Sequence, residues 1–194
     1  LPASQANTTQ VGPAQIYPFI EGDLQFAVAN APLNWDKKFA GRITKGAANG
    51  LLAKVYLTQQ KWGQAMATAN LVMTSGQYDL TTPYNRIFGE TGENSSESVF
   101  EVQATASATI PTANGVEFIQ WQGVRDGGVW NLGYGFNVPN ANLEAAYEAN
   151  DPRKARTFLY RSTPSATYRT VYDEVTPTTW VNPIYNHKVY TNPS

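Results

Sequence analysis

The residues best suited to bind a ligand lie in the segment FIQWQGVRDGGVWNLGYGFN, residues 118–137. It combines aromatic side chains with amide and charged ones, and Gly127-Gly128 lets it bend sharply. Sugars present apolar C–H faces and a rim of hydroxyl groups, so their sites pair aromatic rings with polar donors and acceptors. The segment is therefore predicted to be a glycan-binding loop. The predicted contact residues are Trp121, Trp130, Tyr134, Arg125, Asp126 and Asn131.

An alternative interpretation of the same segment remains open. Trp121 and Trp130 are large enough to fill a core beneath a long loop, in which case neither would meet a ligand. Trp35 and Trp62 are expected in the core, and the pattern does not decide the place of Trp180.

Catalysis by carboxylates is not predicted. The acidic residues considered are Glu90, Glu93, Glu97, Glu144, Glu148 and Asp151. A glycosidase needs two carboxyl groups held at a defined separation, one of them with a raised pKa. Glu144 and Glu148 are four residues apart on a short helix, which is typical of a solvated face. The Glu90–Glu97 loop lacks the spacing of a calcium-binding EF-hand loop. We therefore expect a protein that is not an enzyme.

Composition excludes several other classes. The 194 residues contain no cysteine and a single histidine, His187, so disulfide scaffolds, thiol catalysis and zinc sites are excluded, and no cofactor or metal is predicted. His187 has no evident carboxylate or nucleophile partner and is expected to be structural. A net charge of -1 without basic runs argues against nucleic acid as a partner. The 24 aromatic residues (5 Trp, 11 Tyr and 8 Phe) can close a core.

Helical periodicity is clearest in the first part of the chain. Apolar residues recur at helical spacing over 14–31, 45–60 and 62–75, and Thr44 can cap the second helix. The last two segments are predicted to form an antiparallel hairpin with Tyr56, Ala65 and Ala69 at the contact. Small residues at the crossing with flanking aromatics match one tetratricopeptide-type unit, although another helical hairpin would also fit. Such a unit cannot bury both faces, so either further polypeptide of the same protein or a second copy in a tight dimer is expected against residues 45–75.

The second part of the chain is rich in Gly, Asn, Thr and aromatic residues. Residues 98–103 (SVFEVQ) have strand composition, 142–149 suggest a short helix, and the tail from Arg156 suggests short strands between turns. Asp151-Pro152-Arg153 is predicted to be a structural turn. We expect residues 1–80 to be a tetratricopeptide-like helical part and 81–194 a loop-rich part with the ligand loops, both belonging to one incomplete domain.

Five stretches in order resemble the SusD/RagB family of outer-membrane nutrient-binding lipoproteins. GRITKGAANGLLAKVYLTQQKWGQAMATANLVMTSGQYDL is similar to the family's central helical hairpin, and IEGDLQFAVANAP to the helix before it. NSSESVFEVQ resembles its asparagine-and-glutamate-led strand, AYEANDPRKARTF its helix with an Asp-Pro-Arg turn, and YNHKVY its Tyr–Lys–Tyr segment. The resemblance implies a mostly α fold of tetratricopeptide-like hairpins with long irregular loops and a few short strands.

The resemblance also implies a function and a location. A family member is a lipoprotein exposed on the cell outer membrane that binds oligosaccharide without cleaving it and delivers it to a TonB-dependent, SusC-like transporter. Family members are more than twice this length, so the remaining polypeptide of the same protein is an expected partner and the lipid anchor is expected outside this sequence. Two alternatives stay open: a helical-repeat scaffold for protein interactions, and a peptide-binding member of the same family.

Overall fold

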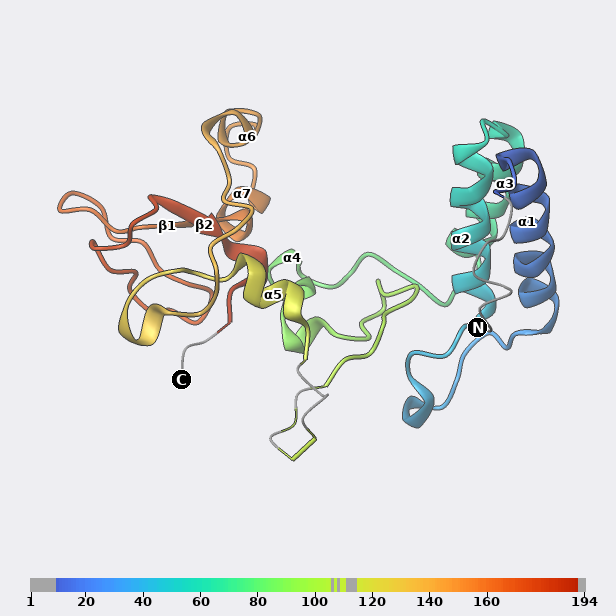
Figure 1. Ribbon diagram of the computed structural model, residues 1–194, viewed down its shortest axis with the longest axis horizontal. Helices are drawn as coiled ribbons and strands as arrows, with labels where there is room; N and C mark the ends of the chain where they lie inside the picture. Colours follow the sequence, from blue (N-terminus) through green and yellow to red (C-terminus); the bar gives the residue numbers. More distant parts are fainter. Residues whose placement is uncertain (1–9, 106, 108, 111–114, 192–194) are drawn as a thin grey trace. The chain divides into compact units, whose positions relative to one another are not determined.

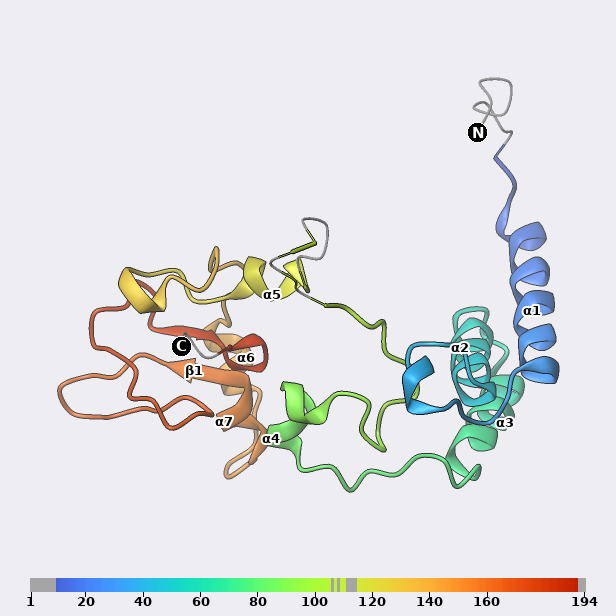
Figure 2. The same ribbon diagram turned by 90° about the horizontal axis from the view of Figure 1, so that it is seen from below.

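The computed structural model describes residues 10–105, 107, 109–110 and 115–191. The chain divides into two compact units (Figures 1 and 2). The helical unit comprises Leu1–Thr81 with Ser96–Val102, and the loop-rich unit comprises Thr82–Ser95 with Gln103–Ser194. In the part of the chain that the structure describes, no helix is long and apolar enough to cross a membrane.

The helical unit contains the three helices that periodicity predicts. They are α1 (Pro13–Asn30), α2 (Lys45–Thr58) and α3 (Trp62–Met73), and α2 packs against both of the others (Figure 1). Thr44 begins α2, because its side-chain oxygen accepts a hydrogen bond from the Ala47 amide at 3.1 Å. A short link, in which Gln60 has a φ of 61°, turns the chain back into α3.

The core of the helical unit lies at the contact of α2 with its neighbours. Leu52, Tyr56 and Ala65 are buried together, and Leu24 and Val28 of α1 pack against them. The predicted contact at Tyr56 and Ala65 is confirmed, and Ala69 is half-buried. The helices bury few other apolar side chains, so much of their apolar surface stays open.

Two tryptophans expected in the core of this unit are exposed. Trp62 is 61% exposed and Trp35 is 39% exposed, so the expectation of buried rings was wrong. Ala65 and Thr68 are the buried residues of α3, and Trp62 lies on its open side. The indole N–H of Trp35 donates to the carbonyl of Ile43 at 2.9 Å, which holds the ring over the loop before α2 instead of inside.

The expected strand at residues 98–103 is also wrong. These residues are not part of a sheet, and Val99 lies against Gly50 of α2. The segment is tied to the helical unit at Ser96, whose hydroxyl donates to the Asp79 carboxylate at 2.7 Å while its carbonyl accepts from the Asp79 amide at 3.1 Å. Of the apolar residues in this segment, Val99 packs on a helix, whereas Val102 is 82% exposed.

The loop-rich unit is built from short elements. Its helices are α4 (Tyr84–Ile87), α5 (Glu117–Gln122), α6 (Ala141–Ala145) and α7 (Arg153–Thr157), with 3-10 turns η3 (Glu90–Gly92), η4 (Gly128–Trp130) and η5 (His187–Val189). Strands β1 (Phe158–Tyr160) and β2 (Ile184–Asn186) pair antiparallel, with Leu159 opposite Tyr185. The helical unit adds a 3-10 turn, η2 (Lys37–Phe39). Short strands were predicted in the tail, and the predicted helix at 142–149 is present as the shorter α6.

Aromatic side chains fill the core of the loop-rich unit. Val124, Leu159, Trp180, Tyr185 and Tyr190 form its buried cluster, with Trp180 fully buried. His187 is buried beside it: its Nδ1 lies 2.8 Å from the Ala155 carbonyl, and its Nε2 accepts from the Val171 amide at 3.1 Å. These partners fix the ring as the neutral tautomer protonated at Nδ1. The expected structural role of His187 agrees with this geometry.

Candidate functional site

Three aromatic rings form an exposed group on the loop-rich unit. Trp121, Tyr134 and Phe136 are each about half exposed, at 50%, 51% and 53%. The Trp121 and Phe136 ring centroids lie 5.8 Å apart with an interplanar angle of 29°, and those of Tyr134 and Phe136 lie 6.3 Å apart at 23°. The Trp121 and Tyr134 centroids are also 5.8 Å apart. We call these three residues the aromatic platform.

Main-chain hydrogen bonds bring the platform together. Trp121 lies on α5, and the later loop runs back along the end of this helix. The amide of Tyr134 donates to the Gln120 carbonyl, and the amide of Phe136 donates to the Trp121 carbonyl, both at 2.9 Å. Gly135, the residue between these two ring-bearing residues, has a φ of 68°, a conformation that favours glycine. The rings are therefore placed by the backbone and not by their own contacts alone.

Two glycines make this close approach possible. A Cβ atom on Gly133 would lie 2.1 Å from the Gln120 carbonyl oxygen, and one on Gly123 would lie 2.5 Å from the Leu132 carbonyl oxygen. Any side chain at either position would push the two backbones apart. Sequence reasoning did not foresee these roles, and a pair of glycines flanking an aromatic loop was the only available signal.

A buried amide holds the base of the platform. Gln122 is 4% exposed, and its Oε1 accepts from Asn137 at 2.6 Å and from Asn186 of β2 at 2.9 Å. Asn137 directly follows Phe136, so this pair of hydrogen bonds anchors the ring-bearing loop to the sheet. Among the described residues, the Nε2 atom of Gln122 has no hydrogen-bond partner.

The structure brings some of the predicted contact residues together and separates others. Trp121 and Tyr134 share the platform, and Arg125 lies beside it, with its Cβ 3.0 Å from the place of a Cβ on Gly135. The Arg125 carbonyl accepts from the Tyr185 hydroxyl at 2.8 Å, while its side chain is exposed. Asp126 is half-buried and Asn131 exposed, on either side of η4.

Trp130 belongs to a different group of rings. It packs edge to face on the fully buried Trp180, with centroids 5.1 Å apart, and its ring lies 6.3 Å from that of Tyr190. The core alternative therefore describes the position of Trp130, whereas Trp121 is open to solvent. Phe136, which was not among the predicted contact residues, occupies the place beside Trp121.

The carboxylates near α6 and α7 are engaged in structural contacts. Glu144 accepts from the Tyr160 hydroxyl at 2.7 Å and lies 3.3 Å from the Lys154 ammonium, and these contacts lower the pKa of its carboxyl group. Two nitrogens of the Arg153 guanidinium, Nε and Nη2, donate hydrogen bonds to the Asp151 carboxylate, and this hydrogen bonding lowers the Asp151 pKa. Ionised carboxylates of this kind accept hydrogen bonds and are unsuited to act as general acids at neutral pH. The Asp151 side chain also accepts from the Arg153 amide, which confirms the predicted structural turn.

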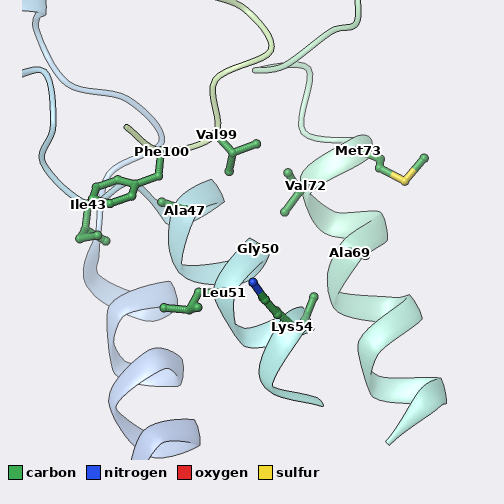
Figure 3. Close-up of a pocket in the computed structure, with 11 residues that line it drawn as sticks. Ile43, Ala47, Gly50, Leu51, Lys54, Ala69, Val72, Met73, Val99 and Phe100 are labelled. Carbon is green, nitrogen blue, oxygen red and sulfur yellow. The ribbon is translucent and has the colours of Figure 1, made fainter. Parts of the chain in front are cut away.

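An apolar groove runs between α2 and α3 in the helical unit (Figure 3). Its volume is about 710 Å³. Ala47 and Leu51 line it from α2, Val72 and Met73 from α3, and Phe100 lies at one end. Leu51, Met73 and Phe100 are all exposed.

Among the described residues, no group of three or more His, Cys, Asp or Glu side chains could hold a metal ion.

Comparison with known proteins shows what this chain is similar to. No protein-family model matches the chain. A curated SusD-like protein of Bacteroides ovatus is 34% identical over 99 residues, an alignment covering 45% of this chain and 18% of that protein. A solved laminarin-binding SusD-like protein aligns with a TM-score of 0.78 and 25% identity, over 99% of this chain and 45% of that one. The chain is SusD-like.

Other solved structures extend this likeness. Surface glycan-binding protein A from Bacteroides thetaiotaomicron, in complex with laminarihexaose, aligns with a TM-score of 0.71 and 21% identity over 94% of the SusD-like chain and 43% of its own. A SusD-like protein from Bacteroides fragilis aligns with a TM-score of 0.64 and 20% identity over 92% and 42%. The mostly α fold with helical hairpins is thereby confirmed. The SusD-like chain spans less than half the length of these solved relatives.

Proposed function

We propose that this chain supplies a glycan-binding surface, the aromatic platform of Trp121, Tyr134 and Phe136. The carrying observation is that three large rings lie together and half exposed, while Trp180, Tyr185 and Tyr190 of the same unit are buried. Exposed rings held at a fixed spacing match the apolar faces of successive sugar units. Arg125, Asp126 and Asn131, in the segment between α5 and these rings, are the proposed partners of the sugar hydroxyls. The laminarin and laminarihexaose bound by two of the relatives make laminarihexaose the first ligand to test.

Calorimetric titration with laminarihexaose tests the proposal. Trp121→Ala removes one exposed ring, and we expect affinity to fall at least tenfold while the melting temperature changes little. Trp62→Ala is the matched control, because Trp62 is also exposed, at 61%, but lies on α3 in the helical unit. Equal affinity in Trp121→Ala and the unaltered chain would refute a role for the platform. Titration with short peptides under the same conditions tests the peptide-binding alternative.

We infer that binding leaves the glycan intact. Glu144 and Asp151 are committed to Tyr160 and Arg153, and their lowered pKa values keep them ionised. Incubation with laminarin should release no reducing sugar. Hydrolysis that is abolished by Glu144→Gln or Asp151→Asn would contradict this inference.

We further propose that the whole protein is a surface-exposed outer-membrane lipoprotein that passes its glycan to a TonB-dependent, SusC-like transporter. This part rests on the SusD-like resemblance. Co-purification of the full-length protein with a transporter from its own membrane tests it. If the full-length protein is recovered free of any transporter after gentle solubilisation, the delivery role is wrong.

The apolar groove supports a second candidate, a helical scaffold for protein contacts. A groove between two helices suits the apolar face of a third helix. Leu51→Glu with Met73→Glu would place charge in this groove without touching the platform. Under the scaffold hypothesis, the double variant loses binding to a protein partner and keeps its affinity for laminarihexaose. Loss of glycan affinity in this variant would argue against separate roles for the two surfaces.

A further inference from the structure

A polar cavity of about 370 Å³ lies in the loop-rich unit, where α4, the turn before α7 and η5 meet. Its lining residues are Tyr84, Ala146, Tyr147, Glu148, Asp151, Arg153 and Lys188. Two of the segments that resemble the SusD/RagB family, AYEANDPRKARTF and YNHKVY, contribute all of these except Tyr84. The aromatic platform contributes none of them.

A buried arginine connects the segments that line this cavity. Arg156 is 4% exposed, and its guanidinium donates to the main-chain carbonyls of Asn85 and His187. These two residues directly precede or follow the lining residues Tyr84 and Lys188 in the chain. The Arg156 side chain thus ties α4, which carries Tyr84, and η5, which carries Lys188, to α7. The cavity is therefore pre-formed.

The charges of the cavity balance. Arg153 and Asp151 are locked together, with the Arg153 Nη2 atom 2.5 Å from the Asp151 Oδ2 atom. The ammonium of Lys188 lies 4.7 Å from the centre of the Phe88 ring and 5.7 Å from that of Tyr84. Among the described residues, neither Lys188 nor Glu148 forms an ion pair. Beside a neutralised pair, the cavity thus offers one ammonium and one carboxylate that have no ion-pair partner in the described part of the chain.

We propose that this cavity binds a neutral polyhydroxylated ligand, a single sugar unit. Vicinal hydroxyl groups both donate and accept, so they can bond Glu148 and Lys188 at the same time. An anion would meet the Glu148 carboxylate, and a cation would meet the Lys188 ammonium, so either charge is opposed. The Tyr84 and Tyr147 side chains supply apolar wall for the C–H groups of the sugar. The cavity shares only its ligand class with the proposed function of the platform and acts as a second, independent site.

Three sugars of one shape but different charge test the proposal. Glucose, glucuronate and glucosamine are titrated into the full chain and followed by NMR shifts at the amides around η5. We expect glucose to bind with a Kd in the millimolar range and both charged analogues to bind at least threefold more weakly. Binding of glucuronate more tightly than glucose would show an anion site, and binding of glucosamine more tightly than glucose would show a cation site. If no sugar binds, the cavity is not a sugar site. Each of these results overturns the proposal.

Variants separate the cavity from the platform. Glu148→Gln and Lys188→Met should each weaken glucose at least fivefold, and Glu148 is exposed, so its change leaves the fold intact. Glu93→Gln and Lys54→Met are matched controls away from the cavity and should change nothing. Trp121→Ala should leave the η5 shifts unaltered, which keeps failure of the platform distinct from failure of the cavity. Equal glucose binding in Glu148→Gln, Lys188→Met and the controls refutes the site.

Discussion

Arg156 donates a hydrogen bond to the main-chain carbonyl of His187, joining α7 to η5 across the interior of the loop-rich unit. The same guanidinium donates from Nε to the Asn85 carbonyl at 3.2 Å, which adds α4 to the junction. No carboxylate among the described residues pairs with Arg156, and burial lowers its pKa. Here the guanidinium of a buried arginine connects three short elements through their main-chain carbonyl groups.

Removing this guanidinium should destabilise the protein strongly. Arg156→Met keeps an apolar stem but removes both hydrogen bonds from the charged guanidinium, and we expect the free energy of unfolding to fall by about 2–4 kcal/mol. Urea denaturation followed by tryptophan fluorescence measures the change. Arg169→Met is the control, because Arg169 is exposed and its ion pair with Asp173 should contribute less than about 1 kcal/mol. Similar midpoints for the two variants would contradict the buried role of Arg156.

Stability should depend on pH through His187. Burial lowers the pKa of its imidazole from an ordinary value of 6.5 to about 4. Between these two pH values the unfolded chain binds more protons than the folded chain, so the free energy of unfolding falls as the pH falls. The contribution of His187, roughly 3 kcal/mol, is complete above pH 6.5 and is lost below pH 4.

Urea denaturation at pH 7, 6, 5 and 4 measures this slope. His187→Gln removes the titrating group, so the variant should be less stable at pH 7 and should lose less stability on acidification. Parallel curves for the two proteins between pH 6.5 and 4 would show that other groups cause the acid sensitivity.

A methyl group at Gly133 should disrupt the platform. The Cβ of Gly133→Ala would meet the Gln120 carbonyl oxygen at 2.1 Å, so the loop must move away from α5 and the rings must separate. We expect a loss of at least tenfold in affinity for laminarihexaose, measured by calorimetry, together with a lower melting temperature. Gly127→Ala is the matched control, because a Cβ there has nothing within 4 Å and φ is -89°. Unchanged affinity in Gly133→Ala would show that the loop position does not matter for binding.

The two tryptophans of the predicted binding loop should respond differently to truncation. Trp130→Ala removes a ring packed on Trp180, and we expect it to cost about 3 kcal/mol or more of stability through lost burial and a cavity. Trp121→Ala should cost less than about 1 kcal/mol, because its ring is half exposed. Chemical denaturation of both variants compares them directly. A greater loss in Trp121→Ala would mean that its ring is structural.

Local pattern was sufficient for the helices of the first unit. Periodicity placed α1, α2 and α3 within a few residues of their observed ends, because each has a repeated apolar face and Thr44 supplies a cap. The same pattern could not tell which side of α3 is covered, since that depends on its neighbours. Trp62 was therefore expected inside and lies outside.

The platform depends on contacts that composition does not encode. Aromatic content pointed to a segment that carries an exposed group of rings, but Trp130 packs on the core and Phe136, which was not among the predicted contact residues, lies beside Trp121. The pairing of residues 132–136 with the end of α5 arises from main-chain hydrogen bonds and from the absence of a Cβ at Gly123 and Gly133. The prediction of a strand at 98–103 was wrong for a related reason. Residues with high β propensity form a strand only where a partner strand is present, and the local sequence does not show whether one is.

Backbone control of the platform makes its side chains interchangeable. The amides of Tyr134 and Phe136 fix where their side chains emerge, whatever those side chains are. Substitution at these two positions would change the surface presented to solvent while leaving the glycine contact and the Gln122 anchor intact. Evolution can thus diversify the recognition chemistry of this loop at little cost to folding, and a protein engineer could use the same two positions as a small library on a constant frame.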